Sequence, residues 1–167
     1  LRRCECDQDG VRLTFRDGTS ERSRFLIGAD GPTSTVRRQL LPDHPGPARY
    51  IAIQEWAEVR DPMPYFSSLF DRRITDYYGW TIPKGDRLAM GVALRPRQNP
   101  LERFERFRQR LREQGIDAGR VIEREGALVL RPLSGRGMLP GTEQAALIGE
   151  AGGWISPSSA EGLSYAF

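Results

Sequence analysis

Two segments of the sequence place glycines beside an acidic side chain directly after an apolar run. They read FLIGADG at residues 25–31 and AALIGEAGG at residues 145–153. Glycine lets a bulky ligand come close to the backbone, and a carboxylate can accept hydrogen bonds from sugar hydroxyls. Free N–H groups at the start of a following helix attract anions. This chemistry suits a nucleotide or flavin cofactor, whereas either segment alone is equally compatible with a tight structural turn.

The elements around these segments predict that each is a corner between a strand and a helix. Residues 11–16 and 21–27 are predicted as a hairpin joined at Asp17-Gly18. The second strand runs into the first corner, and a helix over 35–40 follows. A strand over 145–149 leads into the second corner. A capping box from Ser158 to Glu161 then predicts a helix that starts at Ser158.

The stretch between the corners is predicted to be a sheet and one helix. Strands are expected at 49–59, 65–70, 75–82, 87–94 and 126–130, with a turn at 83–86. The helix spans 99–114, with Asn99 as N-cap, Pro100 as first residue and Glu102 as reciprocal partner in a capping box. Gly115 ends the helix. Its apolar stripe consists of Leu101, Phe104, Phe107 and Leu111, and its Arg-rich remainder is interpreted as a solvated surface.

Composition excludes several classes of protein. The 167 residues are 38% apolar and 28% charged, with a net charge of +3. No apolar run approaches the roughly 20 residues of a membrane-spanning helix, and no basic run indicates nucleic-acid binding. Cys4, Cys6 and a lone His44 do not make a metal site, so none is predicted. The lack of a signal-like stretch predicts a cytoplasmic location.

Taken together, the two corners resemble a known family. The sequence FLIGADGPTSTVRRQL resembles the second fingerprint of the flavoprotein monooxygenase and geranylgeranyl reductase superfamily. The sequence AALIGEAGGWISPSSAEGLSYAF resembles the third fingerprint, in the same order along the chain. The resemblance implies an α/β fold. It would be part of an FAD/NAD(P)-binding Rossmann-like domain with an inserted mixed or antiparallel substrate-domain sheet.

The resemblance also implies which residues contact FAD. Glu150 stands where the family usually has the aspartate that binds the ribityl chain, and this departure puts that contact in question. A helix from Ser158 would direct its positive end at the isoalloxazine ring. Glu161 is interpreted first as part of the capping box. The cofactor-binding candidates are Gly28, Asp30, Gly31, Arg37, Gly149, Glu150, Gly152, Gly153, Pro157 and Gly162.

A third resemblance lies between the corners. The segment 78–84, YGWTIPK, is similar to the Tyr-x-Trp-x-Phe-Pro element of geranylgeranyl reductases and to the Trp-x-Trp-x-Ile-Pro element of flavin-dependent halogenases. On a strand, Tyr78, Trp80 and Ile82 share one face, and the resemblance implies that this face binds substrate. An aromatic stripe facing a core is the alternative. Ile82 replaces the usual Phe, and Thr75 stands where the reductases have Pro.

The predicted organisation follows the motifs. Residues 1–45 and 136–167 are assigned to the FAD-binding domain, and residues 46–135 to the substrate-binding domain. The family's first fingerprint, a Gly-x-Gly-x-x-Gly that binds the ADP half of FAD, is absent. The chain is therefore interpreted as the central part of a longer enzyme, and this part alone is expected to bind FAD poorly and to be inactive.

The predicted activity is reduction of carbon–carbon double bonds of an isoprenoid-type substrate by hydride transfer from reduced flavin. NAD(P)H is a candidate electron donor, and a hydrophobic small-molecule substrate is compatible with peripheral membrane contact. No catalytic acid or base stands out. The alternatives are a flavin-dependent aromatic monooxygenase or halogenase, and a degenerate binding module without enzymatic activity. The sequence does not distinguish reductase from oxygenase and does not indicate the exact substrate or the oligomeric state.

Overall fold

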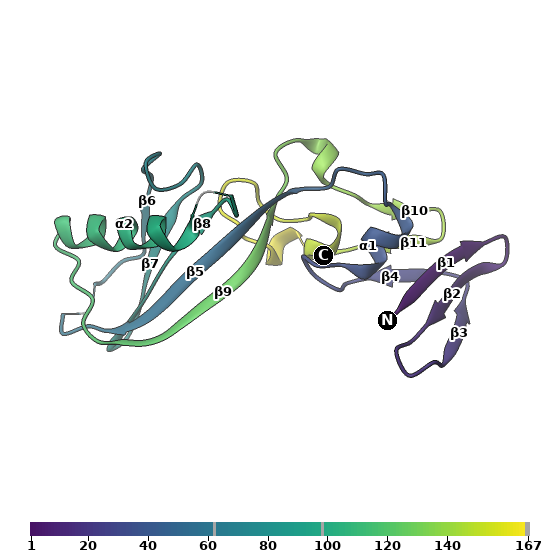
Figure 1. Ribbon diagram of the computed structural model, residues 1–167, viewed down its shortest axis with the longest axis horizontal. Coiled ribbons are helices and arrows are strands. Elements are labelled where there is room, and N and C mark those ends of the chain that lie inside the picture. Colours follow the sequence, from purple (N-terminus) through teal and green to yellow (C-terminus); the bar gives the residue numbers. More distant parts are fainter. Residues whose placement is uncertain (62, 98, 166–167) are drawn as a thin grey trace. The chain divides into compact units, whose positions relative to one another are not determined.

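The computed structural model describes residues 1–61, 63–97 and 99–165. The chain forms two compact units (Figure 1). Unit 1 comprises residues 1–48 together with the chain from Leu130 onward, and unit 2 comprises residues 49–129. Both glycine corners belong to unit 1, and the Tyr78–Ile82 segment belongs to unit 2.

Unit 1 contains two small sheets and short helices. The first sheet is an antiparallel meander in the order β1-β2-β3, and the second has the order β10-β11-β4. The strands are β1 (Arg3–Asp7), β2 (Gly10–Thr14), β3 (Ser20–Ser23), β4 (Leu26–Gly28), β10 (Gly141–Thr142) and β11 (Ala145–Leu147). The helices are α1 (Thr35–Leu40) and the 3-10 turns η1 (Gly135–Gly137), η2 (Gly149–Gly152) and η3 (Leu163–Tyr165).

The predicted hairpin forms, but its second strand is not continuous. β2 and β3 pair antiparallel, as predicted for the Asp17-Gly18 turn. The single strand predicted over 21–27 is wrong, because the chain leaves the meander after Ser23 and β4 joins the other sheet. There the backbone N–H of Leu26 donates to the carbonyl of Gln144 at 3.0 Å. β1, which completes the meander, was not predicted.

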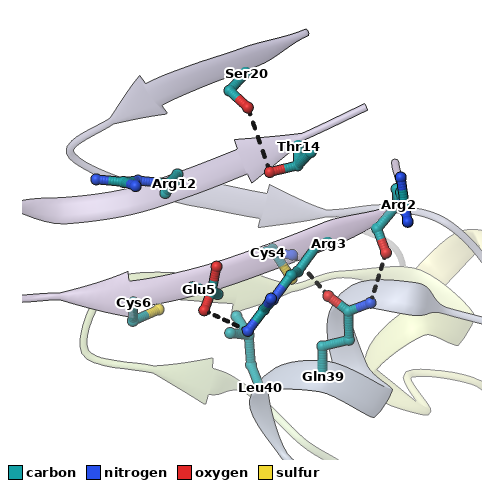
Figure 2. Close-up of a pocket in the computed structure, with 10 residues that line it drawn as sticks. All are labelled: Arg2, Arg3, Cys4, Glu5, Cys6, Arg12, Thr14, Ser20, Gln39 and Leu40. Carbon is teal, nitrogen blue, oxygen red and sulfur yellow. Dashed lines mark hydrogen bonds and ion pairs between the residues drawn. The ribbon is translucent and has the colours of Figure 1, made fainter. Parts of the chain in front are cut away.

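Helix α1 is attached to the meander by a side chain and by apolar packing. The Gln39 amide lies beside the edge of β1, where its Oε1 accepts from the Cys4 N–H at 2.6 Å and its Nε2 donates to the Arg2 carbonyl at 2.9 Å (Figure 2). The buried core of unit 1 consists of Cys4, Val11, Val36, Leu139, Leu147 and Ala151. The core therefore joins the meander, α1 and the strand that leads to the second corner.

Unit 2 is a five-stranded sheet packed against one helix. Its strand order is β6-β7-β8-β5-β9, which confirms the predicted sheet of consecutive strands. The elements are β5 (Ala48–Glu58), β6 (Ser67–Leu69), β7 (Gly79–Lys84), β8 (Arg87–Leu94), β9 (Val121–Arg131) and α2 (Pro100–Glu113). The bounds differ most from the prediction in two strands and one turn. β7 begins at Gly79 rather than at residue 75, the turn is Gly85-Asp86, and β9 starts five residues earlier.

Helix α2 ends as predicted, although its start differs from a capping box. Asn99 has a left-handed backbone (φ 48°), and its side-chain amide donates to Glu102 Oε2 at 2.9 Å. That conformation turns the Asn99 side chain away from the helix N–H groups, so the reciprocal bond does not form. At the other end Gly115 (φ +79°) allows the Ile116 N–H to reach the Leu111 carbonyl at 3.0 Å.

Apolar packing holds α2 on the sheet. Phe104, Phe107 and Leu111 are buried, whereas Leu101 is 59% exposed and does not belong to the packed stripe. The core that they form with the sheet comprises Ile53, Ala57, Ile74, Met90, Val92, Leu94, Phe104, Phe107 and Leu111. Alternate residues of β8 supply its large members, as the two-residue period of a strand requires.

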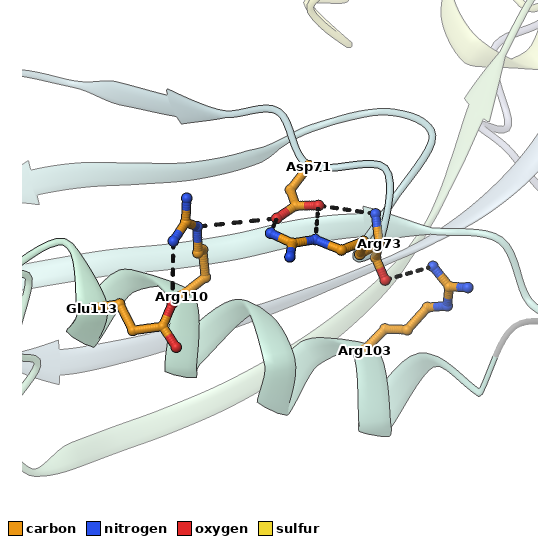
Figure 3. A network of polar contacts seen from close by, with 5 residues as sticks. All are labelled: Asp71, Arg73, Arg103, Arg110 and Glu113. Carbon is orange, nitrogen blue, oxygen red and sulfur yellow. Dashed lines mark hydrogen bonds and ion pairs between the residues drawn. The ribbon is translucent and has the colours of Figure 1, made fainter.

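Charged groups add a second set of contacts to α2. Arg103 donates to the Arg73 carbonyl at 3.2 Å, and Arg110 lies 4.0 Å from Asp71 (Figure 3). Arg103 also donates to the Ile74 carbonyl at 2.8 Å. Asp71 also forms a two-point ion pair with Arg73, at 3.0 and 2.7 Å. Hydrogen bonds from Arg73 lower the pKa of Asp71 to about 2. These contacts fix the loop after β6 on the helix.

A buried carboxylate joins the sheet to α2. Glu55 of β5 is 1% exposed, and its Oε1 accepts from Arg124 Nε and Nη2 at 2.8 and 2.6 Å. Its Oε2 lies 3.3 Å from Arg108 Nε of α2 and accepts no hydrogen bond from the described residues. A buried charge must be paired to be tolerated, so this network specifies how α2 sits on the sheet.

Candidate functional site: two corners joined by Arg37

The two glycine corners lie side by side. β4 and β11 are parallel neighbours, with Leu147 opposite Gly28, and the corners follow these two residues directly. The Ile148 N–H continues the pairing by donating to the Gly28 carbonyl at 3.0 Å. The carboxyl ends of parallel strands are where open α/β sheets commonly bind ligands. Two segments 120 residues apart in sequence thus form one edge.

The first corner is organised around the start of α1. Asp30 Oδ2 accepts from the Thr35 N–H at 2.7 Å and from the Val36 N–H at 3.3 Å. Ser34 is the N-cap, and its Oγ accepts from the Arg37 N–H at 2.9 Å. Partial burial of Asp30 raises its pKa, but hydrogen bonds from Ser34, Val36 and Thr35 outweigh burial and lower the pKa overall. Asp30 therefore orders α1, and its contact with a cofactor stays a prediction.

The second corner turns through η2. The Gly149 carbonyl accepts from the Trp154 N–H at 2.9 Å, and the Trp154 indole donates to the Leu147 carbonyl at 3.1 Å. Glu150 Oε1 accepts from the Leu130 N–H at 3.3 Å. Burial raises the pKa of Glu150, and this hydrogen bond and the Arg37 charge oppose the rise only in part. The Glu150 carboxylate, which is predicted to bind the ribityl chain, is thus half-buried and accepts a hydrogen bond from the backbone of β9.

Arg37 connects the two corners. Its guanidinium donates from Nη1 to the carbonyls of Glu150 and Ala151, at 3.1 and 2.7 Å, and from Nη2 to the Pro32 carbonyl at 2.6 Å. The residue is 8% exposed. The planar, multi-donor guanidinium can satisfy carbonyls on both chains at once. Arg37 therefore sets the spacing between the corners, and its prediction as a cofactor contact remains untested.

The glycines of the corners fall into two groups. Gly28, Gly152 and Gly153 are required by packing, because an added Cβ would lie 2.7 Å or less from neighbouring atoms. Gly31 (φ +70°) and Gly149 (φ +54°) instead need their left-handed backbone, and no atom lies within 4 Å of an added Cβ. Gly162 also faces open space. The open glycines are the positions where a ligand could approach the backbone.

The segment after the second corner differs from the prediction. The helix predicted from Ser158 is wrong for residues 158–165, where the chain forms turns and then η3. Ala160 adopts a left-handed backbone (φ 55°), which interrupts the helix. Glu161 Oε1 accepts from the Ser164 N–H at 2.9 Å, so it caps η3 instead of pairing with Ser158. Contrary to the expectation, residues 158–165 thus form no α-helix whose dipole could be directed at the flavin.

Pro157 is held in place from another strand. Its carbonyl accepts from Arg131 Nε at 2.7 Å, where Arg131 is the last residue of β9. Pro157 and Ser158 are both exposed. The segment predicted to pass the flavin is therefore anchored by a backbone contact and leaves the proline ring accessible.

In unit 2, the aromatic segment forms part of a sheet face. Trp80 and Ile82 lie on β7 and are partly buried, and Tyr78 directly precedes the strand. The rings of Tyr78 and Trp80 are 5.8 Å apart. The two readings of the sequence, substrate wall and core stripe, both remain compatible with partial burial. Substrate binding by these three residues stays a prediction.

Sequence reasoning missed several contributors. Ser34 caps α1, and the signal for it was its position just before an apolar-periodic segment. Gln54 accepts a hydrogen bond from the Trp80 indole, and Gly91 lies beneath that ring. Glu55 had no local signal, since its partners come from α2 and β9.

The described residues contain neither a candidate metal site nor a candidate membrane-spanning helix. No group of three or more His, Cys, Asp or Glu side chains there could hold a metal ion. In the same residues no helix is both long and apolar enough to cross a membrane. A wide pocket in unit 1, lined by Arg2, Arg12 and Gln39 among others, contains no residue of either corner (Figure 2).

Sequence comparison finds relatives that are named Protein CbrA. No family model matches the chain. The chain is 39% identical over 163 residues to Protein CbrA of Escherichia coli O9:H4 (strain HS), which covers 96% of this chain and 44% of CbrA. Protein CbrA of Shigella sonnei (strain Ss046) is also 39% identical, with 46% of it covered. The chain thus spans about half the length of the curated relatives it matches.

Comparison with solved structures identifies the fold. A geranylgeranyl bacteriochlorophyll reductase-like protein from Thermoplasma acidophilum superposes with a TM-score of 0.78 at 19% identity, covering 98% of this chain and 44% of that protein. HpxO of Klebsiella pneumoniae, crystallised with FAD and uric acid, gives 0.62 at 23% identity, covering 99% and 45%. The flavin-dependent halogenase CmlS gives 0.67 at 20% identity, covering 96% and 32%.

The class of fold follows from these matches. The chain has a mixed α/β fold, rich in sheet, that it shares with part of these solved structures, which include a protein crystallised with FAD and a flavin-dependent halogenase. The predicted fold class is confirmed. The comparison does not decide the predicted reductase specificity, because a reductase-like structure and a halogenase structure both match.

Proposed function

We propose that the chain is the central portion of an FAD-dependent oxidoreductase that reduces carbon–carbon double bonds of an isoprenoid-type substrate. Unit 1 contributes to the FAD site, and unit 2 contributes to the substrate site. NAD(P)H is the proposed electron donor. This portion by itself is proposed to bind FAD poorly and to be inactive, since it lacks the glycine-rich segment that holds the ADP half.

One observation carries the proposal. Gly31 and Gly149 stand at adjacent strand ends, with open space where a side chain would be. They need glycine for the backbone, and they leave room for a flat ligand between them and solvent. The residues present therefore fit a flavin cofactor, which in its reduced form supplies a hydride.

The proposed roles follow from the contacts of each residue. Gly31, Gly149 and Gly162 let the cofactor approach the backbone. Arg37 acts as a positioning residue, because its donors are directed at backbone carbonyls of both corners. Asp30 and Glu150 present the rest of their carboxylate oxygens to ribose or ribityl hydroxyls. Gly28, Gly152, Gly153 and Pro157 keep the corners in shape.

A second candidate is an FAD-dependent monooxygenase or halogenase. The similarity to the flavin-dependent halogenase CmlS supports this candidate, as the similarity to the geranylgeranyl bacteriochlorophyll reductase-like protein supports a reductase. The two candidates share the proposed cofactor site and differ in what the reduced cofactor reacts with. A degenerate binding module is the third alternative, favoured by Glu150 in place of aspartate.

The experiment uses the complete protein that carries this chain, purified as expressed. Flavin absorbance bands are expected. Without oxygen, NAD(P)H is expected to bleach these bands. Under the same conditions the carbon–carbon double bonds of an added geranylgeranyl substrate are expected to be reduced. Product formation only in the presence of oxygen would replace the reductase with an oxygenase. A colourless protein that does not take up added FAD would reject both enzymes and support the binding module.

A further inference from the structure

Three tyrosines of unit 2 stand in ring contact with one another. The ring centroids of Tyr50 and Tyr77 are 5.4 Å apart, and those of Tyr77 and Tyr78 are 5.0 Å apart, in tilted and edge-on arrangements. Tyr50 and Tyr77 are buried, at 0% and 6% exposure, whereas Tyr78 is partly exposed. These three side chains, here called the tyrosine chain, therefore lead from the surface of unit 2 to its interior.

Thr75 holds the outer part of the tyrosine chain on β8. Its Oγ1 donates to the Ala93 carbonyl at 2.5 Å and accepts from the Tyr77 N–H at 3.0 Å. The Ala93 N–H in turn donates to the Tyr78 carbonyl at 3.2 Å. Thr75 stands where the reductases that the segment resembles have proline, which has no hydroxyl. The hydroxyl bonds that fix Tyr77 are thus a feature of this sequence.

The inner end of the tyrosine chain has a proton acceptor. The Tyr50 hydroxyl donates to Asp76 Oδ2 at 3.1 Å. The same oxygen accepts from Arg95 Nε at 2.6 Å, and Arg95 Cζ lies 5.4 Å from the centroid of the Tyr50 ring. The side chains of Asp76 and Arg95 are 41% and 43% exposed. A fully buried phenol is therefore hydrogen-bonded to a carboxylate that reaches water.

This arrangement suits the transfer of single electrons. Electrons pass readily between aromatic rings in contact, because the π orbitals of the rings overlap. A tyrosine that gives up an electron becomes a strong acid and must release its phenolic proton. Burial raises the pKa of Tyr78 and so opposes loss of its proton. Tyr50 has the Asp76 carboxylate as proton acceptor, and the missing electron is therefore best sustained at Tyr50.

We propose that the tyrosine chain is a one-electron relay that protects unit 2 from organic peroxyl radicals. Tyr78 gives one electron to the peroxyl radical, which takes a proton from water and becomes a hydroperoxide. Tyr77 then reduces Tyr78, and Tyr50 reduces Tyr77. Tyr50 loses its proton to Asp76 and remains a neutral phenoxyl radical. A soluble reductant such as ascorbate returns the electron, and Asp76 returns the proton.

The relay goes beyond the proposed function and rests on it only for the source of the oxidant. Unsaturated isoprenoid chains form peroxyl radicals with dioxygen, so a protein that binds them meets this oxidant at its surface. The relay itself is built entirely within unit 2 and needs no cofactor.

The first test places an oxidant beside Tyr78 in the complete protein. Phe70 is 75% exposed, and its ring centroid lies 6.0 Å from that of Tyr78. It is replaced by p-azidophenylalanine, to which an alkyne-bearing ruthenium photo-oxidant is coupled. After a laser flash in the presence of a quencher, transient absorption and electron paramagnetic resonance follow the radicals. A long-lived tyrosyl signal is expected, and it should be lost in Tyr50→Phe.

Two further variants test the order of the relay. Tyr77→Phe keeps the ring but removes the oxidisable phenol, and Asp76→Asn keeps an acceptor that cannot take up the proton. Each is expected to slow formation of the long-lived signal at least about tenfold, the lower range for loss of a positioned proton acceptor. Tyr65→Phe is the matched control, because Tyr65 is 60% exposed and lies outside the tyrosine chain. Circular dichroism shows that each variant is folded.

The second test uses the oxidant that the proposal names. The complete protein without the ruthenium label is treated with a water-soluble azo initiator, which releases peroxyl radicals, in the presence of ascorbate. Oxidation of Trp80, whose ring centroid lies 5.8 Å from that of Tyr78, is measured by mass spectrometry. Trp80 is expected to oxidise faster in Tyr50→Phe and Tyr77→Phe than in the wild type or Tyr65→Phe. Flavin absorbance is recorded on each sample.

The outcomes separate the possibilities. A tyrosyl signal that depends on Tyr50 and Tyr77 supports the relay even if the protein is colourless, in which case only the proposed function fails. A signal that is unchanged in Tyr50→Phe or Tyr77→Phe overturns the relay and leaves the proposed function in place. Equal rates in Asp76→Asn and wild type overturn the role of Asp76. Equal oxidation of Trp80 in all variants overturns the protective role.

Discussion

The contacts that stabilise unit 2 internally differ in kind from those that stabilise unit 1 internally. In unit 2, a sheet and α2 enclose the aromatic side chains Phe104 and Phe107, both fully buried. In unit 1, short strands end in glycine corners whose spacing depends on hydrogen bonds from Arg37 to backbone carbonyls. Apolar packing tolerates small shifts, whereas directed hydrogen bonds fix positions.

This difference in contacts agrees with the proposal that unit 1 contributes to the FAD site and unit 2 to the substrate site. A cofactor that must present a reactive atom needs fixed backbone groups around it, and unit 1 supplies them through polar contacts. A long apolar substrate needs surface area and few directed bonds, and unit 2 supplies a sheet face stiffened by the core on its other side. We therefore expect mutations in the core of unit 2 to lower stability alone. Mutations at the corners of unit 1 are expected to lower cofactor retention as well.

The largest effect is expected in the core of unit 2. Phe107→Ala removes a fully buried ring that packs against Gly79 and is expected to lower the free energy of unfolding by about 3–5 kcal/mol. Urea unfolding of the complete protein followed by circular dichroism measures the change. Leu101→Ala is the control on the same helix, since Leu101 is exposed, and it should cost less than about 0.5 kcal/mol. Similar costs for both variants would contradict the assigned core.

The next effect is expected at Arg37. Arg37→Met removes the side-chain donor to three backbone carbonyls, of which that of Glu150 still accepts from the Gly153 N–H, and is expected to cost about 2–3 kcal/mol. Unlike Phe107→Ala, it should also lower flavin retention under conditions in which the protein stays folded. The measurement is flavin absorbance after gel filtration, with exposed Arg38→Met as the control. Unchanged flavin content in folded Arg37→Met would remove the positioning role.

The smallest effect is a pH dependence in unit 2. The pKa of Asp71 is lowered from 3.8 to about 2 by Arg73, so its contribution to stability is fully present above the higher value and is lost as the pH falls through the lower one. The difference in unfolding midpoint between the wild type and Asp71→Asn should be constant near neutral pH and disappear near about pH 2. A difference that persists in acid would show that the contact is not ionic.

Local signals predicted many of the elements. The Asp17-Gly18 hairpin, α2 with its Gly115 end, and the consecutive strands of unit 2 all depend on turn residues and periodicity that are near in sequence. The two failures have different causes, a distant partner strand in one case and the local backbone in the other. Leu26–Gly28 leaves the hairpin because β11 offers parallel pairing, and Ser158–Glu161 does not open a helix because Ala160 is turned to the left-handed region.

The sequence predicted which residue types stand at the two corners, but it did not predict which residues hydrogen-bond across them. The glycines and carboxylates of both corners were identified from residue type and order. The role of Arg37 was not, because the carbonyls that it binds at the second corner are 113 and 114 positions away in sequence. Gln54 and Gly91 were missed for a similar reason, since only the strand register brings them beside Trp80.

The most direct test of the central claim compares two glycines that have the same backbone requirement. Gly149 (φ +54°) lies at the second corner and Gly18 (φ +90°) in the hairpin turn, and neither has an atom within 4 Å of an added Cβ. An alanine at either position should cost about 1 kcal/mol of stability through backbone strain. The measurement is the affinity of the complete protein for FAD in both alanine variants. The account predicts near wild-type affinity in Gly18→Ala and at least about tenfold weaker binding in Gly149→Ala. Equal affinities in the two variants, or no FAD binding by the wild type, would contradict it.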